Sequence, residues 1–279
     1  MAIRNILVAY NGSDSSDAAL RLGLLMARKY DAHLTGVLAH GMPRVMESAM
    51  PWLTEGLSRE FAEIARRMKG EVYAAITDKF RALTDASDLG ERLHWLDIEG
   101  STDATIMELA RCFDITLVGE HQQMTGEEQI ALHPDLVALQ SGRPVLIVPR
   151  GYEVTELNEH AVLAWDGTRA ASRAMSDAMQ ILETKSLVTI LSVGAGDIGA
   201  GYEGADIETH LQRHGVATER VRIPRKGSVG DTIVDYCRDR GAGILVMGAY
   251  EHSKFSEDLL GGVTNEVLLH SAIPVLMSH

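Results

Sequence analysis

The sequence predicts an α/β protein made of two tandem units, each a parallel sheet with helices on both faces. Three observations lead to this prediction. Several motifs occur twice, in the same order. Within each half, short apolar runs alternate with amphipathic helical patterns, as in parallel strands joined by helical crossovers. Many of the runs are continuously apolar, which is typical of strands buried on both faces.

The duplication rests on four pairs of segments. They begin at Asn5 and His160 (NILVAYNGSDSSDAAL, HAVLAWDGTRAASRAM), Gly100 and Gly227 (GSTDATIMELAR, GSVGDTIVDYCR), Asp114 and Gly243 (DITLVGEH, GILVMGAY), and Ser141 and Ser271 (SGRPVLIVP, SAIPVLMSH). Four matches in one order indicate a duplicated unit. The polar connector 150–159 separates the halves, and we therefore expect domains at residues 1–150 and 151–279.

The strands are expected at the apolar runs. In the first unit these are residues 5–10, 33–39, 92–98, 115–119 and 144–148, and in the second 161–165, 187–193, 219–223, 244–248 and 274–278. Ser101 and Ser228 stand where helix N-caps are expected. A long helix starting near Ser58 has no counterpart in the second unit, which carries a glycine-rich stretch after its own second strand.

Composition limits the class of protein. The chain has 279 residues, 46% of them hydrophobic, and a net charge of −13. This charge repels phosphate groups and argues against nucleic acid and anionic membranes as partners. Two isolated cysteines form no disulfide framework and favour a reducing compartment. With no apolar run long enough for a membrane span, we expect a cytoplasmic protein.

Taken together, the turn after the first strand, the glycine ending the fourth strand and the final Pro-Val-Leu strand resemble the universal stress protein family, in two tandem copies. The resemblance implies a fold similar to adenine nucleotide α-hydrolases, with five parallel strands in the order 3-2-1-4-5. It also implies a stress-response binding protein. The ATP-binding branch of the family carries the loop Gly-x2-Gly-x9-Gly-Ser/Thr, in which backbone amides and a helix N-terminus hold phosphates.

The second unit matches this loop in part. Gly248 and Gly261 fit the first and third glycines, Glu251 replaces the second, and Gly262, Val263 and Thr264 follow. Glu251 adds a side chain and a carboxylate where close approach to phosphates is needed. Two hypotheses follow: the second unit binds an adenine nucleotide, such as ATP with Mg²⁺, or Glu251 disables the loop and the protein binds a small apolar ligand or a protein partner.

The resemblance implies four further contacts in the second unit, from Ala164, Asp166, Val193 and Met247. Asp166 would help to hold ribose or metal. Alternatively, Asp166 caps the next helix and Val193 and Met247 belong to the core. In the first unit Gly119 remains, but Asn11 replaces the acidic residue and the loop glycines are lost. We expect no nucleotide there, and rather structural pairing or an uncharged ligand beneath a methionine-rich segment at 42–52.

The sequence gives little support for a catalytic or metal-binding site. There is no Walker A motif, no nucleophile elbow and no acid–base constellation, so we expect no enzyme activity beyond weak ATP hydrolysis. The pairs His121/His133 and His210/His214 lack a third metal ligand at a telling distance, and we expect them to face solvent. By resemblance, the strands at 144–148 and 274–278 should pair antiparallel within the chain, giving an intramolecular pseudo-dimer that could form a homodimer.

Overall fold

The computed structural model describes residues 3–41, 55–121, 130–194, 204–249 and 262–279, with backbone alone for residues 55–69. Its centre is one ten-stranded sheet in the order β3-β2-β1-β4-β5-β10-β9-β6-β7-β8. Each half of this order reads 3-2-1-4-5 from its outer edge, as predicted. The sheet is parallel within each half and antiparallel only where β5 meets β10.

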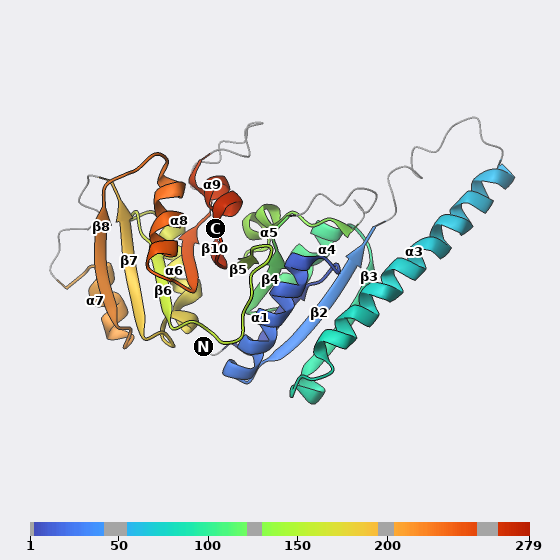
Figure 1. The fold of residues 1–279 in the computed structure, drawn as a ribbon, viewed down its shortest axis with the longest axis horizontal. Helices are drawn as coiled ribbons and strands as arrows, with labels where there is room; N and C mark the ends of the chain where they lie inside the picture. Colours follow the sequence, from blue (N-terminus) through green and yellow to red (C-terminus); the bar gives the residue numbers. More distant parts are fainter. Residues whose placement is uncertain (1–2, 42–54, 122–129, 195–203, 250–261) are drawn as a thin grey trace.

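The first repeat supplies one half of the sheet (Figure 1). Its strands are β1 (Asn5–Ala9), β2 (His33–His40), β3 (Leu93–Glu99), β4 (Ile115–Gly119) and β5 (Val145–Val148). Its helices are α1 (Asp14–Tyr30), α3 (Glu55–Thr84), α4 (Thr102–Ala110) and α5 (Pro134–Gln140), with a short 3-10 turn, η1 (Gly90–Arg92), before β3.

The second repeat supplies the other half. Its strands are β6 (His160–Ala164), β7 (Leu187–Val193), β8 (Thr218–Ile223), β9 (Ile244–Gly248) and β10 (Val275–Ser278). Its helices are α6 (Arg169–Leu182), α7 (Ile207–Arg213), α8 (Val229–Asp239) and α9 (Val263–His270). All ten predicted strands are present, with ends shifted by at most one residue.

The predicted pairing of the two Pro-Val-Leu strands is confirmed. Leu146 of β5 lies opposite Leu276 of β10, and Val145 and Ile147 pair with Met277 and Val275. These strands are buried on both faces, so their side chains alternate between two apolar cores. The pairing converts two edges into the middle of one sheet and leaves β3 and β8 as its outer strands.

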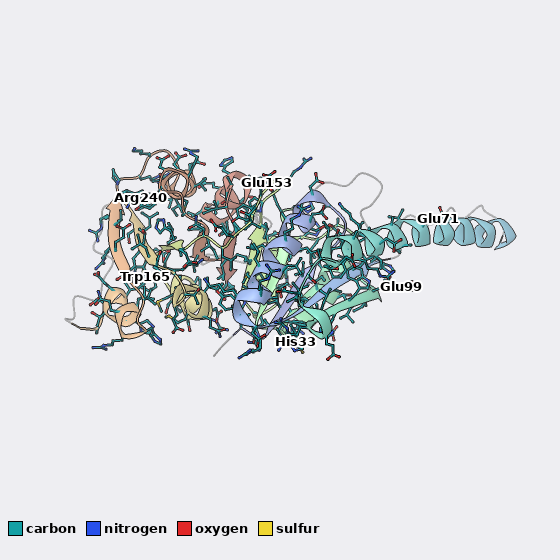
Figure 2. The ribbon with its side chains drawn as sticks, turned by 60° about the horizontal axis from the view of Figure 1, so that its bottom comes forward. His33, Glu71, Glu99, Glu153, Trp165 and Arg240 are labelled. Atoms are coloured by element: carbon teal, nitrogen blue, oxygen red, sulfur yellow. The ribbon has the colours of Figure 1, made fainter. Side chains whose placement is uncertain are left out.

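The helices form two layers. One core packs α1, α3, α6 and α7 against the sheet, and the other packs α4, α5, α8 and α9. The C-terminal part of α3 is seated because Gly36 of β2 leaves room for Phe80, whose ring would lie 2.3 Å from a Cβ at that position. The rest of this helix extends beyond the sheet (Figures 1 and 2).

Helix starts follow the local sequence. Ser228 accepts a hydrogen bond from the Asp231 amide and caps α8, as predicted. Ser101 occupies the N-cap position of α4, but its side chain makes no capping hydrogen bond. Ser13 and Thr168 cap α1 and α6 through the amides of Ser16 and Ala171.

Candidate functional site

The carboxyl ends of β1, β2 and β4, and of β6, β7 and β9, form two equivalent edges, where ligands of open α/β sheets bind. At each edge the first strand runs into the same turn. The side-chain oxygen of Asn11 accepts from the Ser13 amide at 3.2 Å, and that of Asp166 accepts from the Thr168 amide at 3.0 Å. The intervening Gly12 and Gly167 have φ of 78° and 80°, a conformation that favours glycine.

The glycine that ends the fourth strand of each repeat is required by packing. A Cβ on Gly248 would lie 2.4 Å from the carbonyl carbon of Ala170 and 2.6 Å from the amide nitrogen of Ala171. On Gly119 it would lie 2.6 Å from the carbonyl carbon of Ser15. Each glycine therefore lets its strand end touch the first turn of α1 or α6. Packing alone therefore explains both glycines, whether or not a ligand binds.

Only some of the site residues predicted in the second repeat lie together at its carboxyl edge. The described members are Ala164, Asp166, Val193, Met247, Gly248, Gly262, Val263 and Thr264, and Glu251 and Gly261 lie outside the described residues. Asp166 is exposed, and Ala164, Val193 and Gly248 are half-buried at strand ends.

Two of these residues face inward. Met247 is 4% exposed and packs in the core beneath α8 and α9, where the half-buried Val193 also packs. Thr264 is 6% exposed in the first turn of α9.

Asp166 does not cap α6, because Thr168 occupies that position. The alternative that Asp166 caps α6 is therefore wrong: its side chain accepts from the Thr168 amide, in the turn before the helix.

Gly262, the residue before α9, has a conformation that favours glycine. Its φ is 94° and its ψ is −159°, and it stands at the N-cap without a side chain to satisfy the helix amides. The first amides of any helix have no partner within that helix. Glu266 in the first turn reaches away to α8, where its Oε2 accepts from the Gly230 amide at 3.1 Å. The α9 N-terminus is thus formed by a glycine, and the carboxylate of its first turn bonds another helix.

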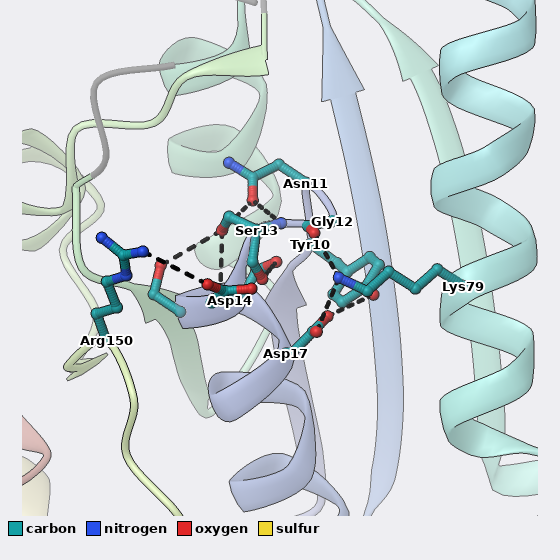
Figure 3. A network of polar contacts seen from close by, with 10 residues as sticks. Tyr10, Asn11, Gly12, Ser13, Asp14, Asp17, Lys79 and Arg150 are labelled. Carbon is teal, nitrogen blue, oxygen red and sulfur yellow. Dashed lines mark hydrogen bonds and ion pairs between the residues drawn. The ribbon is translucent and has the colours of Figure 1, made fainter.

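In the first repeat a polar network ties the turn to α3 (Figure 3). The Tyr10 hydroxyl donates to Asp17 Oδ1 at 2.7 Å, and Lys79 Nζ lies 2.8 Å from Asp17 Oδ2. Lys79 also donates to the Gly12 carbonyl oxygen at 2.7 Å. Burial, followed by the Asp17 carboxylate, raises the pKa of Tyr10 far above its usual range. No sequence pattern predicted this network, although two signals were present: Asp17 stands where the matching segment of the second repeat has Ser172, and Lys79 lies in the long helix that has no counterpart there.

A small hollow lies beside this network. It encloses about 20 Å³ and is lined by Tyr10, Ser13 and Ser15 together with the apolar Ile106, Ile130 and Leu132. Such a volume suits about one water molecule. The neighbouring polar groups are bonded within the chain: Ser15 donates to the Glu120 carbonyl oxygen at 3.0 Å, and Asn11 Nδ2 donates to the Ile130 carbonyl oxygen at 3.2 Å. The segment 42–52, expected to cover this edge, lies outside the described residues.

Metal ligands do not gather within the described ranges. No group of three or more His, Cys, Asp or Glu side chains there is placed to hold an ion. The His121 and His133 rings lie 4.9 Å apart, but Nδ1 of His121 bonds the Leu132 carbonyl oxygen and Nδ1 of His133 bonds Asp103. Over the same ranges, no helix is long and apolar enough to cross a membrane.

Comparison with known proteins identifies the family. The model of the universal stress protein family matches residues 2–149 and again 157–279. The chain therefore belongs to the universal stress protein family and carries two tandem copies of its domain. A universal stress protein of Synechocystis is 22% identical over 172 residues. That match covers 59% of this chain, which spans 57% of the length of the relative.

Solved structures support the fold over the whole chain. A universal stress protein from Archaeoglobus fulgidus aligns with a TM-score of 0.67 at 16% identity, covering 98% of this chain and 95% of that one. A functionally unknown protein from Pseudomonas aeruginosa aligns with a TM-score of 0.58 at 15% identity, covering 99% and 92%. At these identities the likeness establishes the tandem fold alone.

Proposed function

We propose that this chain is a cytoplasmic stress-response binding protein whose second repeat binds an adenine nucleotide, with Mg²⁺ where the nucleotide is ATP. The observation that carries the proposal is the contrast between Asp166 and Asn11 in otherwise equal turns. Asp166 is exposed and, among the described residues, makes no ion pair, so its carboxylate is available to a metal ion or a ribose hydroxyl. Asn11 is half-buried, and its amide bonds Ser13 and Ile130.

The α9 N-terminus supports the same proposal. Gly262 stands there without a side chain, so a phosphate could approach the first amides of the helix, and the helix dipole favours negative charge at that point. Asp166, Gly248 and Gly262 would hold the nucleotide from β6, β9 and α9. Bound Mg²⁺ would neutralise phosphate charge beside Asp166.

The experiment exploits the near-equivalence of the two turns. Asp166→Asn keeps the oxygen that accepts from the Thr168 amide and removes only the charge, because asparagine already serves this turn in the first repeat. Asn11→Asp adds the charge to the other turn and is the matched control. Calorimetry with Mg-ATP, Mg-ADP and AMP should give micromolar affinity for the unaltered chain.

The Asp166→Asn variant loses one charge-assisted contact and should bind the nucleotide about tenfold more weakly than the unaltered chain. Asn11→Asp should leave the affinity unchanged. No heat at millimolar ATP, with circular dichroism showing a folded chain, would reject the nucleotide. In that case the hypothesis of a non-nucleotide ligand or a protein partner would take its place.

A further inference from the structure

The two repeats meet at a group of polar residues far from the carboxyl edges. We call this group the inter-repeat seam; it consists of Lys29, Tyr30, Asn158, Glu159, Thr184 and Lys185. The Tyr30 hydroxyl lies 3.2 Å from Thr184 Oγ1, and Lys29 Nζ lies 3.2 Å from Glu159 Oε1. The seam thus joins the end of α1, the connector between the repeats and the segment after α6.

The seam holds two lysine ammonium groups but only one carboxylate between them. Glu159 is bonded to Lys29, which also donates to the Thr184 carbonyl oxygen at 3.5 Å. Lys185 has a neutral partner instead, because its Nζ donates to the carbonyl oxygen of Asn158. Lys185 is half-buried and has the positive charge of Lys29 close by.

These surroundings disfavour the charged form of Lys185. The pKa of Lys185 is lowered to about 8, chiefly by burial and then by the Lys29 charge, while the Glu159 charge acts in the opposite direction. The Tyr30 hydroxyl stays neutral near this pH, because burial raises its pKa. Desolvation and a neighbouring cation are the conditions under which a lysine becomes a nucleophile near neutral pH.

We propose that Lys185 is an acylation site, at which small activated acyl donors such as acyl phosphates and thioesters modify the inter-repeat seam. The neutral Nζ attacks the carbonyl carbon of the donor with its lone pair. The new N–C bond forms as the C–O bond of an acyl phosphate, or the C–S bond of a thioester, breaks. Phosphate or thiolate leaves with the bonding electrons, and the nitrogen releases one proton to water.

The expected selectivity follows from the fraction of neutral amine. At pH 7 about one tenth of Lys185 is uncharged, against roughly 1 in 2,500 for an ordinary lysine, an advantage of about 200-fold. A less basic amine is also a weaker nucleophile, as known for thiols, and this effect divides the 200-fold advantage by roughly ten to twenty. Lys185 should therefore react about tenfold faster than an exposed lysine at pH 7.

The test uses the full folded chain, which has six lysines and thus few sites to resolve. Acetyl phosphate and, in a second arm, an acetyl thioester are added at pH 6.5 to 10, and acetylation at each lysine is followed by mass spectrometry. The exposed Lys226 is the internal reference. The Lys185 rate should level off above pH 8 while the Lys226 rate continues to rise.

Two variants separate the proposed cause from simple exposure. Lys29→Met removes the neighbouring cation and should slow Lys185 acetylation several-fold at pH 7. Glu159→Gln removes the carboxylate and should speed it. The proposal is overturned if Lys185 reacts no faster than Lys226, or if both variants, shown by circular dichroism to be folded, leave its rate unchanged. A response to only one donor would identify the donor class.

Discussion

Replacing Gly248 by alanine should destabilise the protein even without a ligand. The added methyl carbon would lie 2.4 Å and 2.6 Å from backbone atoms of Ala170 and Ala171, about 1 Å closer than a normal carbon contact. Those atoms lie in the first turn of α6, which Thr168 caps and which packs on the core. Overpacking of this kind costs about 1–3 kcal/mol, and we expect the upper end because backbone must move.

Part of that cost is recovered in the unfolded chain. Replacing glycine by alanine reduces the entropy of the unfolded state and returns about 0.5–1 kcal/mol. The net loss in the free energy of unfolding should therefore be about 2 kcal/mol. Urea titration followed by circular dichroism measures this difference in nucleotide-free protein.

The chain provides two companions for this measurement. Gly119→Ala repeats the clash in the first repeat, where a Cβ would lie 2.5 Å from Ser15 Oγ and 2.6 Å from its carbonyl carbon, and it should cost a similar amount. Gly70→Ala in α3 has no atom within 4 Å of the new Cβ and should stabilise the helix by about 1 kcal/mol. A loss below about 0.5 kcal/mol for Gly248→Ala would refute the close contact between β9 and α6.

Two further predictions concern the remaining buried polar groups. In Lys79→Met, Tyr10 is the remaining described side-chain partner of Asp17, whose side chain is 10% exposed. The substitution should lower the free energy of unfolding by about 2 kcal/mol. This is below the 3–5 kcal/mol typical of a fully buried pair because the Lys79 side chain is 41% exposed, and unchanged stability would contradict the network. A disulfide reagent at pH 8 should modify the exposed Cys112 quickly and the buried Cys237 only on unfolding, since burial raises the pKa of Cys237 to about 12. Because the unfolded thiol ionises from about pH 9, this residue should also lower stability above pH 9, and Cys237→Ala should reduce that loss.

Local patterns predicted the secondary structure closely. Runs of five to seven residues predicted the ten strands, and the family resemblance of the repeated motifs predicted their order. The proline that precedes β5 and β10 marks the start of each strand, and their pairing was predicted from the family resemblance. These features depend on neighbours in sequence or on the repeat itself.

The candidate site was less predictable, because side-chain roles depend on distant partners. Asp166 and Thr168 could each have capped α6, and only the backbone geometry assigns the cap to Thr168. Met247 lies at the strand end next to Gly248, yet it points into the core. The Tyr10–Asp17–Lys79 network joins residues 62 positions apart, a contact that no local pattern records.

By itself, the sequence determined the duplicated α/β architecture, since hydrophobic periodicity and turn glycines act locally and occur twice. The tertiary structure decided why particular glycines are needed and which charged groups pair with one another among the described residues. Gly248 is fixed by its contact with α6, and Lys185 is left with a carbonyl oxygen because Glu159 bonds Lys29. The physical reason is that steric contact and the pairing of charges depend on distances between segments, which only the folded chain sets.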